Sequence, residues 1–267
     1  MKIGVYQNYP QFGKKEENTA LALTELSDID ADLMVLPELF NTGYQFVSKE
    51  EAANLAEEIP DGITCRAMAE LARKRGTFLV FGLAEKDGGR LYNSAVVIGP
   101  DGLIGTYRKT HLFDEEKLFF SPGDTGFRIF DIGKARIGVM ICFDWWFPEA
   151  ARTLAIMGAD IICHPANLVL QGCQQAMKTR SLENGVFSAT ANRIGVESRG
   201  GKTALTFTGR SQILNCTGEL MTALERDRTG ISIVQIDVLQ ARDKTIGRQN
   251  NRFLDRRPEF YGPVTKE

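Results

Sequence analysis

Hydrophobic and polar positions along the chain form two kinds of segment that alternate from one end to the other. Short apolar runs, such as Leu-Met-Val-Leu at residues 33–36, predict buried strands. Stretches with apolar residues three or four apart, such as 63–75, predict helices, and Gly76 fits the C-terminal cap of that helix. The predicted strands are 2–7, 32–36, 77–82, 91–98, 103–107, 127–131, 136–141, 161–163, 187–191, 212–215 and 231–236, and the predicted helices are 16–27, 63–75, 148–157 and 174–184.

This alternation predicts an α/β protein in which helices cover the faces of the strands. The strands are more numerous than one short open sheet needs, which favours two sheets. No Pro-rich or Ser-rich linker interrupts residues 1–267, so we expect a single domain. Residues 197–209 are rich in Gly, Lys and Thr and are predicted to form a loop. The tail from about residue 248 is charged and aromatic, and we expect it to dock on a partner subunit.

Composition narrows the functional class. The formal net charge of −2 gives no electrostatic reason to bind nucleic acid or an anionic membrane. The apolar runs are too short to span a bilayer, and no secretory signal is visible. Five scattered cysteines without C-x-x-C spacing favour reduced thiols and a cytoplasmic protein. With two histidines and no metal-binding spacing, we expect no metal site.

Cys142 is the first candidate for chemistry. It follows the predicted strand 136–141 and precedes a predicted helix that begins at Pro148. A nucleophile in such a strand–turn–helix arrangement is exposed at the end of the strand, and a helix N-terminus favours the thiolate. The alternative is a buried cysteine that behaves as a small hydrophobic residue.

Glu38 and Lys109 are the next candidates. Glu38 ends a buried run and has Pro37 and Leu39 as neighbours. A carboxylate in apolar surroundings can accept a proton near neutral pH, because burial disfavours its charged form; a structural ion pair is the alternative. Lys109 follows the predicted strand 103–107. Taken alone, Lys109 and its neighbour Arg108 would be a solvated basic pair.

Together these residues lie in blocks that resemble the motifs of the nitrilase superfamily, in that family's order of Glu, Lys and Cys. The blocks are Leu36–Phe40, Tyr107–Phe113 and Ile141–Asp144, the last followed by Pro148 and Glu149. Three further stretches are similar to the family, namely Asn93–Ala95, Ser121–Asp124 and Arg180–Asn184. The resemblance extends over almost the whole chain, from Ile3 to about Ile236.

The resemblance implies a four-layer αββα sandwich of two mixed sheets with helices outside, a homodimer or larger assembly, and a mechanism without a cofactor. It also implies that Cys142 is the nucleophile and Glu38 the general base. Lys109 and the backbone N–H of Phe143 would stabilise the tetrahedral intermediate. Glu116 is similar to the family's second carboxylate, with the adjacent Glu115 as its competitor.

The residues after the cysteine bear on the substrate. Nitrilases of this superfamily usually follow the cysteine with Trp-Glu, whereas Phe143 and Asp144 stand here and are nearer the amidase branches. We therefore expect hydrolysis of small, largely uncharged amides to acid and ammonia through a thioester, with nitrile hydrolysis as the alternative. A catalytically silent scaffold and acyl transfer to an amine are further alternatives. A papain-like mechanism would instead need His111 or His164 as base.

Aromatic and amide side chains are expected around this chemistry. Tyr44, Trp145 and Asn167 are predicted to contact the substrate. For Trp145, packing in the core is an equal alternative. Trp146 is expected in the core or at a subunit interface instead.

Overall fold

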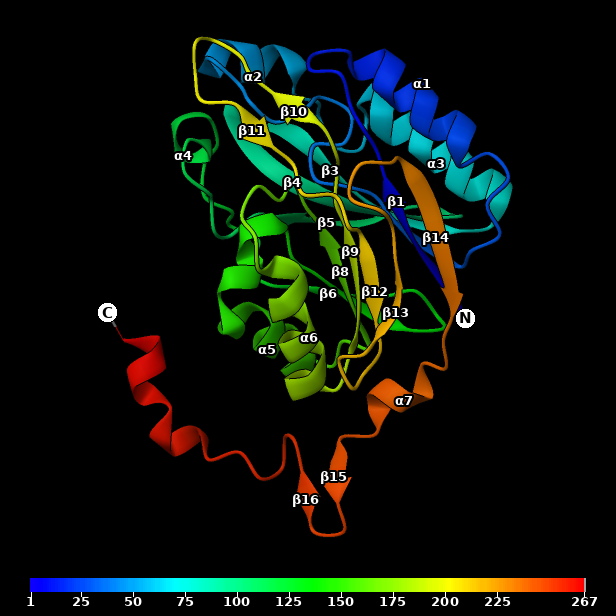
Figure 1. Cartoon of the computed structure of the whole chain (residues 1–267), viewed down its shortest axis with the longest axis vertical. Helices are drawn as coiled ribbons and strands as arrows, with labels where there is room; N and C mark the ends of the chain where they lie inside the picture. Colours follow the sequence, from blue (N-terminus) through cyan, green and yellow to red (C-terminus); the bar gives the residue numbers. More distant parts are fainter. Residues whose placement is uncertain (267) are drawn as a thin grey trace.

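Two six-stranded mixed sheets pack face to face in the computed structural model, which describes residues 1–266 (Figure 1). The first sheet has the order β14-β1-β2-β3-β4-β5 and the second the order β13-β12-β9-β8-β7-β6. The strands of the first sheet are β1 (Lys2–Gln7), β2 (Leu33–Val35), β3 (Phe78–Asp87), β4 (Arg90–Gly99), β5 (Gly102–Arg108) and β14 (Gly230–Gln235). Those of the second are β6 (Ile129–Asp131), β7 (Arg136–Val139), β8 (Ile161–Pro165), β9 (Phe187–Ala191), β12 (Gln212–Leu214) and β13 (Leu220–Ala223).

The inner strands β1–β4 of the first sheet are buried on both faces over most of their length, which explains their apolar runs, whereas the edge strands β5 and β14 are only partly buried. In β2, Leu33 and Val35 belong to the core between the two sheets, whereas Met34 belongs to the core on the opposite face. In β1, Ile3 belongs to the core between the sheets and Tyr6 to the core on the opposite face. Successive side chains of a strand point to opposite faces, so one apolar run supplies both layers.

Helices cover the outer face of each sheet (Figure 1). α1 (Lys15–Glu25) and α3 (Ile63–Arg75) lie over the first sheet, and α5 (Pro148–Ile156) and α6 (Cys173–Asn184) lie beside the second. Gly76 ends α3 in a left-handed conformation with φ +64°, as its position predicted. The predicted αββα sandwich is therefore confirmed.

The shortest elements are where the structure departs from the sequence prediction. Residues 197–209 are not wholly a loop, because β10 (Val196–Glu197) and β11 (Leu205–Thr206) pair within this region. Strands of two residues are too short to show an alternating pattern. The sequence also did not predict the helices α2 (Lys49–Leu55), α4 (Glu116–Phe119) and α7 (Leu239–Arg242), or strand β13.

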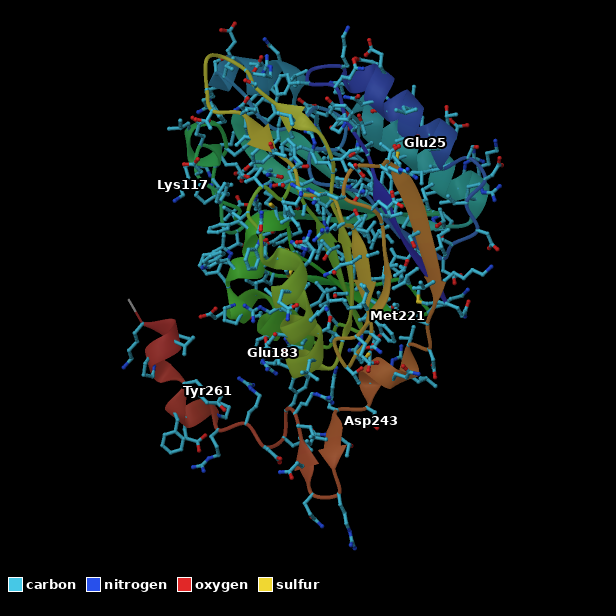
Figure 2. The ribbon with its side chains drawn as sticks, in the orientation of Figure 1. Glu25, Lys117, Glu183, Met221, Asp243 and Tyr261 are labelled. Atoms are coloured by element: carbon cyan, nitrogen blue, oxygen red, sulfur yellow. The ribbon has the colours of Figure 1, made fainter. Side chains whose placement is uncertain are left out.

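The C-terminal segment leaves the sandwich (Figure 1). It contains the small pair β15 (Thr245–Gly247) and β16 (Asn250–Asn251), followed by two 3-10 turns at Pro258–Phe260 and Gly262–Thr265. Figure 2 shows Tyr261 on this segment, away from the two sheets. Among residues 1–266, no helix has the length and apolar character needed to cross a membrane.

Candidate active site

Both sheets contribute to one group of buried polar side chains at the ends of their strands. Glu38 follows β2, and Lys109 follows β5 directly. Cys142 follows β7 of the second sheet and begins the 3-10 turn η1 (Cys142–Trp146). Gly82 of β3 allows the backbone at Glu38 to approach closely, because a Cβ at this glycine would lie 2.5 Å from the Glu38 Cα.

Lys109 lies between two carboxylates. Its Nζ is 2.6 Å from Glu38 Oε1 and 2.7 Å from Glu116 Oε1, and all three side chains are buried. Burial by itself lowers the pKa of Lys109, but the charges of Glu116 and Glu38 outweigh burial and raise that pKa above its ordinary value. Lys109 is therefore a buried ammonium ion. Its hydrogen bonds to the two carboxylates are stronger than hydrogen bonds between neutral groups.

The two oxygens of Glu38 have different surroundings. Oε1 accepts hydrogen bonds from Lys109 and from the Asn93 amide, whose Nδ2 is 2.7 Å away. Oε2 is buried and has no hydrogen-bond partner among residues 1–266. An unpaired buried carboxylate oxygen is unfavourable for folding, which makes it a candidate for a functional role. It can accept a proton without breaking a hydrogen bond.

Glu116, and not Glu115, faces Lys109. The Tyr44 hydroxyl donates to Glu116 Oε1 at 2.6 Å, and the backbone N–H of Phe113 donates to Oε2 at 3.3 Å. Glu115 instead pairs with Lys202 near the surface. Burial raises the pKa of Glu116 to about 6, with Glu38 adding to the rise and Lys109 and Tyr44 opposing it.

Cys142 adopts a left-handed backbone conformation, with φ +40°. A residue other than glycine is strained there by roughly 1–3 kcal/mol, and such strain gathers at functional sites. Burial raises the pKa of the Cys142 thiol well above its usual range, the Glu38 charge adds to this, and Lys109 opposes it. At neutral pH the side chain is therefore a thiol that needs a base before it can act as a nucleophile.

Both histidines bond to groups other than this thiol. His164 Nε2 is 2.9 Å from the Cys142 carbonyl oxygen, and Nδ1 is 3.1 Å from Thr190 Oγ1. Burial lowers the pKa of His164 to about 4, so its ring is neutral near pH 7. Because a carbonyl only accepts, Nε2 carries the proton and holds the backbone of Cys142. His111 contacts Asp144.

A small cavity of about 10 Å³ lies at Cys142. Trp145 and Asn167 are among its lining residues, and the Asn167 amide N and O are buried without partners among residues 1–266. Tyr44 lines a second cavity of about 170 Å³, and Phe113 lines both. Trp146 is 52% exposed, so it does not pack in the core of this chain.

Residues 2–244 match the family model described as carbon–nitrogen hydrolase. The chain belongs to the carbon–nitrogen hydrolase family. A nitrilase of Pyrococcus abyssi is 48% identical over 98% of this chain and 99% of its own length. An N-carbamoylputrescine amidase of Solanum lycopersicum is 35% identical over 86% of this chain and 83% of its own length. The family predicted from the sequence blocks is thereby confirmed.

Solved structures agree with the fold of this hydrolase. A carbon–nitrogen hydrolase from Helicobacter pylori G27 superposes with a TM-score of 0.89, with 27% identity over 100% of this chain and 99% of that one. An amidase from Nesterenkonia sp. AN1 has a TM-score of 0.81 and 24% identity, over 99% of each chain, and shows the shared fold.

The sequence did not predict that Asn93, Asp144 and His164 hold this site together. Asn93 and Asp144 were inside the blocks that resemble the family, which was the available signal. Asp144 is fully buried and accepts the hydroxyl of Tyr107, 37 residues away in the chain, at 2.8 Å. Each of the three acts through a contact between segments far apart in the chain, which no local pattern shows.

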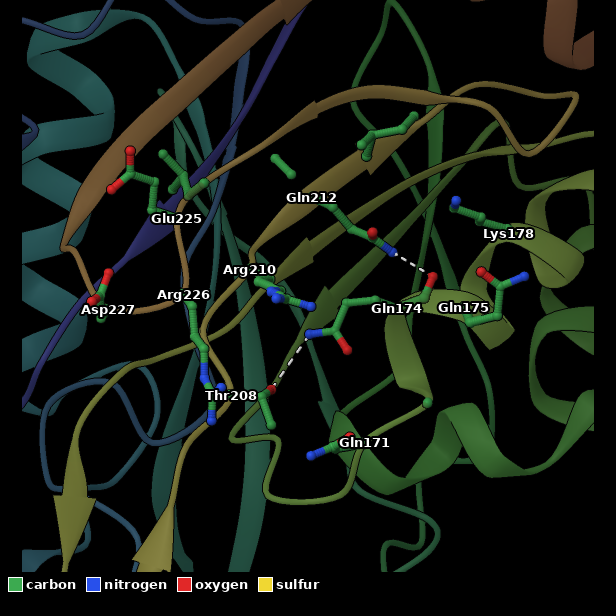
Figure 3. Close-up of a pocket in the computed structure, with 14 residues that line it drawn as sticks. Gln171, Gln174, Gln175, Lys178, Thr208, Arg210, Gln212, Glu225, Arg226 and Asp227 are labelled. Carbon is green, nitrogen blue, oxygen red and sulfur yellow. Dashed lines mark hydrogen bonds between the residues drawn. The ribbon is translucent and has the colours of Figure 1, made fainter.

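A larger cavity of about 830 Å³ lies elsewhere, between α6 and the β12–β13 strands (Figure 3). Gln174 lies on its α6 side and donates to Thr208 Oγ1 at 3.4 Å. Its lining includes Arg210, Arg226 and Asp227, and does not include Glu38, Lys109 or Cys142. In residues 1–266, no group of three His, Cys, Asp or Glu side chains is placed to hold a metal ion.

Proposed function

We propose that this hydrolase cleaves small, largely uncharged amides to a carboxylic acid and ammonia through a thioester on Cys142. The observation that carries the proposal is the unpaired Oε2 of Glu38 in a site where the Cys142 thiol has a raised pKa. Such a site needs a base that is already inside it. Relatives named as amidases, including an (R)-stereoselective amidase of a Pseudomonas species at 33% identity, support the reaction class.

In the first half-reaction, Glu38 Oε2 takes the proton from the Cys142 thiol. The thiolate attacks the amide carbon, and negative charge develops on the carbonyl oxygen. The Lys109 ammonium and the backbone N–H of Phe143 stabilise that charge, and each such donor contributes roughly 3 kcal/mol in a preorganised site. Glu38 then passes the proton to the nitrogen, the C–N bond breaks, ammonia leaves, and a thioester remains.

In the second half-reaction, Glu38 takes a proton from water as the water oxygen attacks the thioester carbon. The C–S bond breaks, the acid is released, and the proton on Glu38 returns to the Cys142 sulfur. The sum is one amide and one water to one acid and one ammonia. Asn93 and Glu116 keep Glu38 and Lys109 in place throughout, because each donates to or accepts from one of them.

The cavity residues support the substrate class. Asn167 presents an unpaired amide beside Cys142, which suits hydrogen bonding to a substrate amide, and Trp145 supplies an apolar wall. A cavity of about 10 Å³ admits roughly one water molecule. A substrate must therefore be small where it meets Cys142, or displace the side chains around it. We propose that Tyr44, which lines the second cavity together with Phe113, contacts a longer substrate.

Nitrile hydrolysis is the second candidate, because the relative at 48% identity is named a nitrilase. The deciding experiment measures ammonia release by the pure protein on small nitriles, each paired with its amide. Turnover of amides, lost in Cys142→Ala and kept in the matched control Cys216→Ala, is the expected result. Turnover of nitriles without amides would replace the proposal by the second candidate. If neither amides nor nitriles release ammonia, acyl transfer to an amine and a catalytically silent scaffold are the remaining candidates.

We further propose that the chain acts as a cytoplasmic homodimer or larger assembly and that the tail from about residue 248 docks on the partner. The tail lies outside the residues matched to the family, and Leu254, Phe260 and Val264 on it are each at least 60% exposed. Exposed apolar residues favour burial against another surface. A chain ending at residue 247 is expected to form an assembly of fewer subunits, measured by sedimentation. An unchanged number of subunits would contradict the docking.

A further inference from the structure

Glu197 is a buried carboxylate far from the catalytic segments in sequence. It is 6% exposed and lies in β10, and it forms an ion pair with the fully buried Arg193. Its Oε2 accepts the backbone N–H of Tyr44 at 3.0 Å and that of Gln45 at 2.6 Å. A single carboxylate therefore holds the turn on which Tyr44 stands.

The turn is shaped for this contact. Gly43 has φ +85°, and a Cβ at this position would lie 2.8 Å from Glu197 Oε1. Only glycine fits both the backbone conformation and the close approach of the carboxylate. The Arg193 guanidinium also lies 4.0 Å from the centre of the Phe207 ring, and that ring packs edge-on against Tyr44 at 6.0 Å between centres.

Tyr44 in turn reaches the site. Its hydroxyl donates to Glu116 Oε1, the same oxygen that accepts from Lys109 Nζ. Lys109 also donates to Glu38. Glu197 thus holds the backbone of Tyr44, and hydrogen bonds from the Tyr44 hydroxyl continue through Glu116 and Lys109 to Glu38.

We infer that Glu197, paired with Arg193, is a positioning residue for this reaction: it fixes the Tyr44 turn so that the Tyr44 hydroxyl holds Glu116 against Lys109. The inference rests on the proposed function for its kinetic readout. The turn loses its conformational entropy when the protein folds. Tyr44 therefore does not have to be immobilised when substrate binds.

A double-mutant cycle tests it, with Glu197→Gln, Tyr44→Phe and the double variant. In Glu197→Gln, an amide NH₂ must face either Arg193 or the two backbone N–H groups, so a donor meets a donor. Each single change is expected to lower kcat about 10- to 100-fold, the scale of a hydrogen bond to a charged group. Because Glu197 acts through Tyr44, the double variant should lose no more than the worse single variant.

The pH profile separates positioning from a merely structural role. Glu116 faces Lys109, Glu38 and Tyr44, and the Tyr44 hydroxyl lowers the pKa of Glu116. Both single variants should therefore move the acid limb of kcat to higher pH. The inference would be overturned if the kcat losses of the two single variants multiplied in the double variant. It would also be overturned if kcat fell while the acid limb of its pH profile stayed at the same pH.

The matched control is Glu51→Gln. Glu51 pairs with Arg199 at 2.7 Å and so joins the same two segments of the chain without contacting Tyr44. We expect it to keep kcat and the acid limb of the wild type; an effect equal to that of Glu197→Gln would overturn the inference, since tethering alone would then suffice.

A second variant and a second measurement test the inference if Glu197→Gln does not fold or if the wild type is inactive. If Glu197→Gln does not fold, Arg193→Gln/Glu197→Gln removes both buried charges and avoids leaving one unpaired. If the wild type hydrolyses neither amides nor nitriles, the proposed function fails, and the same variants are compared by the pH dependence of iodoacetamide labelling at Cys142. Coupled shifts in that labelling would still support the inference, and independent or absent shifts would still overturn it.

Discussion

The carboxylate of Asp144 lies 2.7 Å from Nδ1 of His111 and also accepts the backbone N–H of His111 at 3.1 Å. The same carboxylate accepts the hydroxyl of Tyr107 and the backbone N–H of Ile141, each at 2.8 Å. Tyr107 and His111 flank Lys109, and Ile141 precedes Cys142. One buried side chain thus sets the separation of the segment that carries Lys109 from the segment that carries Cys142, one from each sheet.

Asp144→Asn is therefore expected to lower kcat about 100-fold, since a misplacement of roughly 1 Å has an effect of that size. An asparagine puts an NH₂ where the carboxylate accepted hydrogen bonds, so one segment loses its anchor. Steady-state kinetics with an amide measure kcat and KM separately. Asp131→Asn, at an exposed position, is the control. A change in KM alone would show that Asp144 does not align the segments.

Glu38→Gln is expected to reduce kcat about 10²- to 10⁴-fold, the range for loss of a general base. The glutamine keeps the shape of the side chain but cannot take the Cys142 proton. Steady-state kinetics with an amide measure this loss, since the Glu38 charge also raises the pKa of the Cys142 thiol and thiol labelling would combine two opposing effects. Activity within a few-fold of the wild type would exclude Glu38 as the base.

Activity should fall as the pH drops below about 6, where Glu116 takes up a proton and loses its charge interaction with Lys109. Glu116→Gln removes this ionisation, so the acid limb at about 6 should disappear along with most of the activity. Glu115→Gln is the matched control, because Glu115 faces Lys202 instead. The check is kcat measured from pH 5 to 8; a limb that persists in Glu116→Gln would assign it to another group.

His164 should make the protein less stable in acid. Its pKa is lowered from the ordinary 6.5 to about 4 in the folded state, chiefly by burial. Between these values the unfolded chain binds the extra proton, so the free energy of unfolding falls as the pH drops through this window. From pH 6.5 to pH 5 the fall is about 1.6 kcal/mol, because the unfolded histidine is already half protonated at pH 6.5. Urea unfolding at both pH values should show a smaller fall in His164→Gln; equal falls would contradict the prediction.

Phe113 should limit the length of the substrate, because it lines both the cavity at Cys142 and the 170 Å³ cavity beside Tyr44. Phe113→Ala is expected to raise kcat/KM for amides with longer chains about 10-fold relative to the shortest one. Phe119→Ala is the control, since Phe119 lines only the second of these two cavities. A chain-length series measures the ratio, and an unchanged preference would remove Phe113 as the barrier.

The sequence by itself determined the layers and the family. Apolar runs long enough to show their period placed the main strands and helices within a few residues, because burial imposes that period on one segment at a time. The blocks at Glu38, Lys109 and Cys142 identified the family, because each is a local run of residues with the reacting group inside it. Two-residue strands such as β10 were missed, since they are too short to show a period.

Only the tertiary structure decided how the site is held. The turn into α4 determines that Glu116 faces Lys109 and that Glu115 faces Lys202. The sequence of two adjacent glutamates does not indicate which of them points inward. The contact of Glu197 with the Tyr44 turn joins positions 153 residues apart. Such contacts form because two sheets bring strand ends together, and the pairing of distant side chains follows from packing, which no single segment encodes.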